Sequence, residues 1–328
     1  MPTVLITGGT GMIGRRLSQM LMEKGIEVIV LTRDNSKTKS QNSKNLLSDK
    51  ENTSAISYAH WDVEKKLIDK NAIEKADFII HLAGAGVAEK KWTKKRKKEI
   101  IESRTKSSAL IVDALKENSN KVKAVVSASA IGWYGADTIE SLQNGFTEDA
   151  PAANDFLGTT CKLWEQSIES VTVLNKRLIK LRTGIVLSND GGAFTEFKKP
   201  LKAGVAAILG SGKQIISWIH IDDICHMYLH AIENENLNGV YNAVAPNPVT
   251  NKNFILQLAK LVKNKSFIAV HIPKFILKLM LGELSIEVLK STTINASKIR
   301  AAGFTFLYPS IESALQQLCA KESLQHQQ

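Results

Sequence analysis

The stretch from Thr7 to Gly14 reads TGGTGMIG, and it follows the apolar run Val4–Ile6 near the start of the chain. The apolar run predicts a buried strand, and the segment Ile13–Lys24 predicts a helix that ends at Gly25. The glycines therefore lie in a strand-to-helix turn, where the backbone can approach a pyrophosphate and helix N–H groups favour an anion. We expect this turn to bind a dinucleotide through Gly8, Thr10, Gly11, Met12, Ile13 and Gly14.

Strand-like and helix-like segments alternate through the first half of the chain, which is typical of a parallel sheet. The further strands are expected at Val28–Leu31, Ile56–Ala59, Phe78–Leu82, Val122–Ser127 and Leu178–Leu181, and long helices at Lys94–Lys116 and Lys252–Val262. The predicted fold is α/β, a Rossmann-type doubly wound parallel sheet with a smaller C-terminal substrate lobe. We assign residues 1–183 and a return segment at about 214–245 to the nucleotide-binding domain, and residues 184–213 and 246–320 to the lobe.

Composition and charge narrow the class of ligand. The chain has 328 residues, 44% of them apolar and 23% charged, as in globular proteins. The net charge of +11 is spread along the chain, and its densest run, Glu89–Glu99, predicts the solvated basic face at the start of a helix. Because no nucleic-acid-binding motif accompanies it, the charge favours an anionic small ligand over nucleic acid. The polar segment Asn35–Ser54 is expected to be a flexible surface loop.

The cysteines and the apolar runs indicate the compartment. Cys161, Cys225 and Cys319 have neither disulfide-framework nor zinc-site spacing. No leader sequence is apparent, and no apolar run reaches the roughly 18 residues that span a bilayer. We therefore expect a cytoplasmic protein with no bound metal.

The end of the second predicted strand bears on which dinucleotide binds. The residues there are Leu31, Thr32, Arg33 and Asp34, and Thr32 stands where an acid would bind the adenosine ribose. Arg33 favours NADP(H) over NAD(H), because a guanidinium pairs with a 2′-phosphate in bidentate fashion. Asp34 is an alternative, local partner for Arg33.

The spacing T-G-x-x-G-x-x-G resembles that of the short-chain dehydrogenase/reductase superfamily, and further stretches extend the likeness. These stretches are WD (61–62), HLAGAG (81–86), SASAIGWYG (127–135), KLWE (162–165), LRTGIVLSNDGGA (181–193), GSGKQIISWIHIDDI (210–224) and NAVAPNPVTN (242–251). From about Thr3 to about Leu318 the chain resembles the atypical extended members called epimerase-family proteins, which end in a family-specific segment of unknown role. The resemblance implies an NAD(P)-dependent epimerase/dehydratase-like protein, with cofactor contacts at Asp62, Leu82, Ala83 and Gly84.

The resemblance also implies reactive residues, with one departure from the pattern. In the superfamily, a tyrosine four residues before a lysine transfers the proton, the lysine holds the nicotinamide ribose, and a serine orients the substrate. By that match the serine is Ser129 and the lysine is Lys162, but Gly158 stands at the tyrosine position. Tyr134 is a further catalytic candidate, although a packing role at the mouth of the cleft is its favoured interpretation.

Other polar residues have structural interpretations beside the functional ones. Cys161 is expected to be a buried small side chain, and His220 a core or supporting histidine. Trp218, Asp222 and Asp223 resemble the segment that closes the substrate cleft, although the aspartates also suit a helix cap. Arg182 fits an anionic substrate or an internal salt bridge equally well.

The expected activity is that of an NADP(H)-dependent oxidoreductase or epimerase acting on a hydroxyl or carbonyl carbon of a small substrate, with a nucleotide-linked sugar as one candidate. Gly158 motivates the alternative, a catalytically impaired NADP(H)-binding sensor or scaffold. We expect a small-molecule substrate and neither nucleic acid nor membrane as partner, and we leave a homodimer open.

Overall fold

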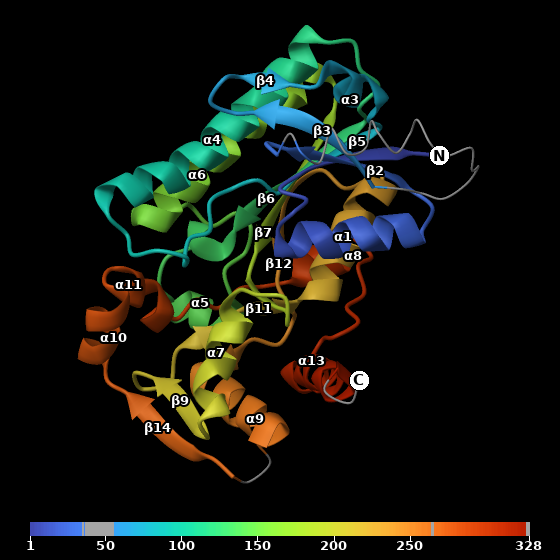
Figure 1. The fold of residues 1–328 in the computed structure, drawn as a ribbon. Helices are drawn as coiled ribbons and strands as arrows, with labels where there is room; N and C mark the ends of the chain where they lie inside the picture. Colours follow the sequence, from blue (N-terminus) through green and yellow to red (C-terminus); the bar gives the residue numbers. More distant parts are fainter. Residues whose placement is uncertain (35, 37–55, 264–265, 326–328) are drawn as a thin grey trace.

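A twisted, mostly parallel sheet forms the centre of the protein in this computed structural model, which describes residues 1–34, 36, 56–263 and 266–325 (Figure 1). Within these residues the sheet has eight strands in the order β12-β7-β6-β5-β1-β2-β3-β4, and only the β3–β4 pair is antiparallel. The strands are β1 (Thr3–Thr7), β2 (Glu27–Thr32), β3 (Ile56–Asp62), β4 (Leu67–Ile68), β5 (Phe78–His81), β6 (Ala124–Ala130), β7 (Arg177–Thr183) and β12 (Gly239–Ala243). The predicted Rossmann-type fold is confirmed.

Helices cover both faces of this sheet, which explains the continuous apolar runs in its strands. On one face lie α1 (Met12–Glu23) and α8 (Ile221–Glu233); on the other lie α3 (Lys70–Lys75), α4 (Lys94–Glu117) and α6 (Phe156–Ile168) (Figure 1). Successive side chains of a strand point to opposite faces, so Val4 and Ile6 pack with α1 and α8 whereas Leu5 packs with α4.

Helix α4 packs against the sheet through Ile111 and Leu115. Its basic entry is not wholly solvated, as the sequence suggested. Arg96 is only 5% exposed and pairs with Glu89 and Glu99, because its position on the helix faces the loop after β5.

The remaining elements form a smaller assembly below the sheet in Figure 1. Phe194, Trp218 and Phe254 contribute to its own apolar core. Three strand pairs, β8–β11, β9–β14 and β10–β13, join distant parts of the sequence. The elements are β8 (Ile185–Leu187), α7 (Ala193–Lys202), β9 (Val205–Leu209), β10 (Ile215–Ile216), β11 (Trp218–His220), β13 (Val249–Thr250), α9 (Asn251–Lys263), β14 (Ile268–Ile272), α10 (Lys274–Leu281), α11 (Leu284–Leu289) and α13 (Ile311–Gln325).

The chain crosses between the two parts more often than expected. The return segment supplies α8 and β12, but residues 294–306, which we placed in the lobe, also pack beside the sheet. Ile299 of α12 (Ser297–Ala301), Phe304 and Phe306 are buried there with α8. Short elements α5 (Ile139–Asn144), η1 (Ile131–Trp133) and η2 (Glu169–Leu174) complete the connections.

Two further expectations concern the polar loop after β2 and membrane-spanning helices. The predicted loop Asn35–Ser54 lies outside the described residues except for Ser36. Among the helices that the structure describes, none combines the length and apolarity needed to cross a bilayer.

Candidate cofactor cleft and neighbouring polar network

The glycine turn holds β1, α1 and the loop after β5 at backbone contact. Gly8 has φ +69°, and a Cβ there would lie 2.8 Å from the carbonyl carbon of Leu82. A Cβ at Gly14 would lie 2.5 Å from both Gly8 O and Gly9 Cα. Larger residues would therefore push the helix away from the strand, which is why glycines are required here.

The N-terminus of α1 is available to an anion. Its N-cap is Gly11, which has no side chain to accept hydrogen bonds from the first helical N–H groups. These groups and the helix dipole favour a phosphate. The turn thus fits the pyrophosphate of a dinucleotide.

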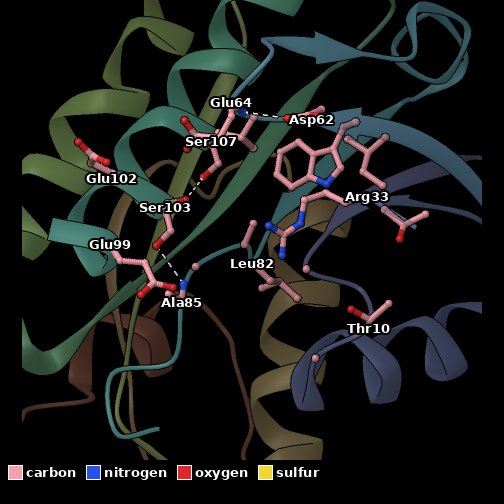
Figure 2. A pocket seen from close by; sticks show the side chains of 18 of the residues that line it. Thr10, Arg33, Asp62, Glu64, Leu82, Ala85, Glu99, Glu102, Ser103 and Ser107 are labelled. Atoms are coloured by element: carbon pink, nitrogen blue, oxygen red, sulfur yellow. Dashed lines mark hydrogen bonds between the residues drawn. The ribbon is translucent and has the colours of Figure 1, made fainter. Parts of the chain in front are cut away.

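A cavity of about 880 Å³ opens from this turn (Figure 2). The ends of β2 and β3, the loop after β5, and α4 form its other walls. Eight predicted cofactor residues line it: Gly8, Thr10, Gly11, Arg33, Asp62, Leu82, Ala83 and Gly84. Met12, Ile13 and Gly14 do not; Met12 and Ile13 pack against the apolar core, and Gly14 packs against the turn.

Sequence reasoning missed the α4 wall of the cavity. Figure 2 shows Glu99, Glu102, Ser103 and Ser107 of α4 facing the space across from Arg33. Their spacing of three and four residues marks one helix face, but which face turns to the cavity depends on packing.

Arg33 is exposed at the cavity and makes no hydrogen bond or ion pair with another described residue. Asp34, the alternative partner, instead accepts hydrogen bonds from the backbone N and the Oγ of Ser36, at 2.9 and 2.6 Å. The guanidinium of Arg33 is therefore free to meet a ligand phosphate.

Asp62 lines the same cavity as an acceptor. The backbone N–H groups of Lys65 and Glu64, each at 3.1 Å, lower the pKa of its carboxyl group. The group is ionised at neutral pH and can accept hydrogen bonds from ligand amino or hydroxyl groups.

A buried hydrogen-bonded chain holds the loop after β5. Thr7 Oγ1 contacts His81 Nδ1 at 2.7 Å and accepts from the backbone N–H groups of Leu82 and Ala83 at 3.1 and 3.2 Å. Burial lowers the pKa of His81 to about 3, so the ring is neutral. This contact fixes the backbone at Leu82–Gly84, where it lines the cavity.

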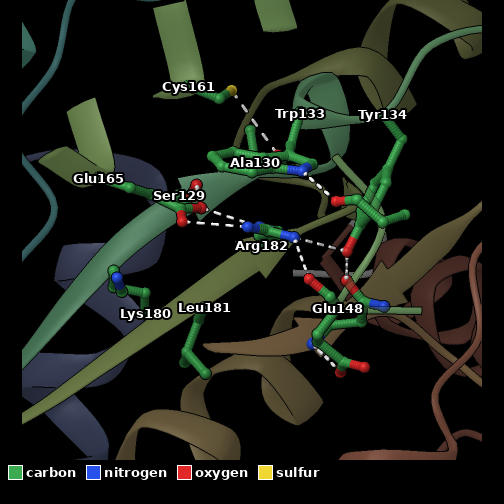
Figure 3. Close-up of polar contacts among 12 residues, drawn as sticks. Ser129, Ala130, Trp133, Tyr134, Glu148, Cys161, Glu165, Lys180, Leu181 and Arg182 are labelled. Atoms are coloured by element: carbon green, nitrogen blue, oxygen red, sulfur yellow. Dashed lines mark hydrogen bonds and ion pairs between the residues drawn. The ribbon is translucent and has the colours of Figure 1, made fainter. Parts of the chain in front are cut away.

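Ser129 belongs to a buried polar network rather than to the cavity (Figure 3). Its Oγ donates to Glu165 Oε1 at 2.7 Å, and the Arg182 guanidinium binds both oxygens of Glu165, at 2.8 and 3.1 Å. All three residues are at least 95% buried. Arg182 thus forms an internal salt bridge, one of the two roles expected for it.

Tyr134 completes this network. Its hydroxyl donates to Asn242 Oδ1 at 2.7 Å and accepts from Arg182 Nη1 at 3.0 Å. Burial raises the pKa of the phenol to about 12, and the Trp133 ring covers Arg182 with 3.7 Å between its centroid and Cζ. Tyr134 is thus packed and hydrogen-bonded inside the protein; it is fully buried and does not line the cavity, whereas a place at the mouth of the cleft was expected.

The face of helix α6 that packs against β6 does not include Lys162, the residue that matches the superfamily's lysine. Cys161 is buried, with Sγ 3.6 Å from Ala130 O, whereas the next residue, Lys162, is exposed. Consecutive helical residues point about 100° apart, so the structure does not bring Lys162 to Ser129. A Cβ at Gly158 would overlap Ala153 O, so this position has no room for a tyrosine. Burial also raises the pKa of the Cys161 thiol to about 12.

The sequence comparisons agree with this architecture. The family model described as NAD dependent epimerase/dehydratase family matches residues 4–156, and a domain of unknown function (DUF1731) matches residues 272–318. The epimerase family protein YfhF of Bacillus subtilis is 31% identical over 97% of this chain and 98% of its own length. The chain belongs to the epimerase family.

Solved structures of epimerase-family proteins have the same fold. The human epimerase family protein SDR39U1 (isoform 2), crystallised with NADPH, has a TM-score of 0.80 and 26% identity, and covers 97% of this chain and 99% of its own. A nucleoside-diphosphate sugar epimerase from Corynebacterium glutamicum has a TM-score of 0.72 and 28% identity; this chain spans 61% of that longer one.

In this epimerase-family chain, the residues expected to cap α8 have other partners. The N-cap is His220, which is fully buried and whose Nδ1 accepts from the Asp222 backbone N–H at 3.1 Å. Asp222 pairs with Arg16 of α1 at 2.6 Å, and Asp223 accepts from the backbone N–H groups of Leu307 and Tyr308. The capping prediction for these aspartates is wrong, because both side chains tie α8 to distant segments. Trp218, expected to close the cleft, is buried in the core of the smaller part.

Proposed function

We propose that the protein is an NADP(H)-dependent oxidoreductase or epimerase that acts on a hydroxyl or carbonyl carbon of a small, nucleotide-linked substrate. The observation that carries this proposal is the cavity itself, in which an uncapped helix N-terminus and the unpaired Arg33 lie at two separate walls. Both groups favour phosphate, as NADP(H) provides at its pyrophosphate and 2′ positions.

The similar proteins support the same class. NADPH accompanies the human epimerase family protein, and the Corynebacterium glutamicum protein is named for nucleoside-diphosphate sugars. A bound nicotinamide dinucleotide supplies hydride acceptance and donation.

This chain's residues would perform the binding and orientation. Gly8 and Gly11 leave room for the pyrophosphate, Arg33 binds the 2′-phosphate, and Asp62 accepts hydrogen bonds near the adenine. Ser129, Tyr134 and Lys162 remain proposals for catalysis. The two hydroxyls would have to exchange their present hydrogen bonds to reach a substrate, and Lys162 would have to bind from the outer face of α6.

Fluorescence titration with NADPH and NADH tests the cofactor assignment in wild-type, Arg33→Ala and Arg300→Ala proteins. Arg300 is an exposed arginine that does not line the cofactor cavity and serves as the control. We expect Arg33→Ala to lose about 1.5–3 kcal/mol of preference for NADPH, as for a charge-assisted hydrogen bond. An unchanged NADPH/NADH preference would contradict the role of Arg33, and a wild-type protein that binds neither dinucleotide would contradict the function.

The buried network favours a second candidate, a cofactor-binding sensor or scaffold with impaired catalysis. Position 158 excludes a tyrosine, and the hydroxyls of Ser129 and Tyr134 are both engaged in internal hydrogen bonds. A sensor requires clearly different affinities for NADPH and NADP⁺. Equal affinities, or hydride transfer to a carbonyl or sugar-nucleotide substrate followed at the nicotinamide absorbance band, would exclude it.

A further inference from the structure

Arg104 of α4 is a buried cation beside the cofactor cavity. The residue is 9% exposed, and its guanidinium lies over the Trp164 ring with Cζ 4.9 Å from the centroid. A Cβ built on Gly84 would lie 3.1 Å from Arg104 Cζ, so the guanidinium touches the loop segment that lines the cavity. The side chain reaches from α4, beneath this loop, toward α6.

Only part of this guanidinium has a partner. Nη1 donates to Ala85 O at 3.0 Å and to Ile100 O at 2.9 Å, both neutral carbonyls. Nε and Nη2 form no hydrogen bond with any described residue. Neither atom is completely shielded from solvent. The Nε–Nη2 edge of Arg104 is therefore not fully enclosed. Arg104 itself does not line the cavity; its guanidinium lies directly behind Gly84, which does, with Nε 3.4 Å from a Cβ built on that glycine.

The charges around Arg104 leave it without a carboxylate of its own. The nearby acid Glu89 forms its ion pair with Arg96 instead. The positive charges of Arg96 and Arg104 repel each other. The thiol of Cys161, which faces it from α6, is un-ionised at neutral pH. Arg182, by contrast, binds both oxygens of a buried carboxylate. A buried cation without an anion is costly, and a ligand anion would remove that cost.

We propose that the Nε–Nη2 edge of Arg104 binds an oxyanion of the ligand, a phosphate or carboxylate group that lies beside Gly84. The inference rests on the proposed function, because it requires a ligand in this cavity. The oxyanion belongs either to the cofactor pyrophosphate or to an acidic substrate, and both sources share the fork geometry that a guanidinium recognises.

Calorimetric titration and thermal unfolding of wild-type, Arg104→Met and Arg104→Lys proteins test the proposal. The probes are NADPH, adenosine 2′-monophosphate, which lacks both phosphates of the pyrophosphate, and inorganic phosphate added to the NADPH-saturated protein. If the cofactor supplies the oxyanion, Arg104→Met weakens NADPH binding roughly 10- to 100-fold and leaves the binding of adenosine 2′-monophosphate unchanged. If the substrate supplies it, NADPH affinity is unchanged, and phosphate raises the unfolding temperature of the wild-type complex but not of the variant. Arg104→Lys keeps the charge without the fork and is expected to have an intermediate effect, which keeps the test valid if Arg104→Met does not fold.

Arg177 offers a matched control. Its Nη1 donates to Ala231 O of α8 and to Asn234 O and Leu237 O in the segment between α8 and β12. Arg177→Met should lower the unfolding temperature without changing any ligand affinity. If Arg104→Met behaves like Arg177→Met, the role of Arg104 is structural and the inference is overturned, whereas the proposed function fails only if the wild-type protein binds no dinucleotide.

Discussion

Removing one charge of the buried ion pair between Glu165 and Arg182 should greatly lower the free energy of unfolding. Glu165 accepts three hydrogen bonds, from Arg182 Nε, Arg182 Nη2 and Ser129 Oγ. Glu165→Gln keeps the size of the side chain but places an amide NH₂ group against these donors. The Arg182 side chain, only 3% exposed, is then left without its counter-ion.

We expect Glu165→Gln to lower the free energy of unfolding by about 3–5 kcal/mol, the cost of breaking a buried ion pair by removing one partner. The Glu169–Lys180 pair is a matched control. It joins η2 to the same strand, β7, at 2.6 Å, but the Glu169 side chain is 54% exposed. Glu169→Gln should therefore cost about 1 kcal/mol or less, because solvent screens the pair.

Urea unfolding of the ligand-free protein, followed by circular dichroism, measures both variants. The double variant Glu165→Leu with Arg182→Met should recover part of the loss, since it removes both buried charges. NADPH affinity should stay within about twofold, because neither residue lines the cavity. The reasoning is refuted if Glu165→Gln shifts the urea midpoint no more than Glu169→Gln does.

Three further changes test other parts of the site. Gly14→Ala places a Cβ 2.5 Å from backbone atoms, so it should lower the free energy of unfolding by about 1–3 kcal/mol and weaken NADPH binding. In the control Gly135→Ala the new Cβ meets only Ala153 Cβ at 3.4 Å, so neither change is expected. Equal unfolding temperatures of the two variants would contradict this reasoning. His81 has a pKa of about 3 when folded, below the unfolded value of about 6.5, so the unfolded chain binds the extra proton and stability falls by about 1.4 kcal/mol per pH unit between pH 6.5 and about 3. His81→Asn should flatten that decline in pH-dependent urea unfolding, and an unchanged slope would show that the ring is not buried neutral. Lys162→Ala tests the proposed ribose contact: the unfolding temperature should stay unchanged because the side chain is exposed, a loss of NADPH affinity measured by calorimetry would support the contact, and an unchanged affinity would contradict it.

The glycine turn and the cavity wall that holds Arg33 were largely predictable from the sequence, because their determinants are local. Gly8, Gly11 and Gly14 act through backbone geometry within one turn, and Arg33 follows β2 directly. Their positions are settled once the strand–turn–helix order is recognised. The α4 wall was not predictable. Which face of α4 borders the cavity depends on the path of the segment between β5 and α4 and on how the helix packs, and neither is encoded in the local sequence pattern.

The reactive half depended on side-chain direction. Counting residues placed Lys162 four positions after Gly158, but the register of α6 against β6 turns Cys161 and Glu165 inward and Lys162 outward. The hydroxyls of Ser129 and Tyr134 find partners 36 and 108 residues away, at Glu165 and Asn242.

The sequence by itself determined the doubly wound sheet, the glycine turn after β1 and the basic residue that follows β2, because apolar periodicity and glycine spacing act over a few residues. The tertiary structure alone decided which polar side chains are buried together and which remain open to a ligand. Hydrogen bonding and desolvation depend on segments that meet only in the folded chain, and they bind Arg182 to Glu165 while leaving an edge of Arg104 free.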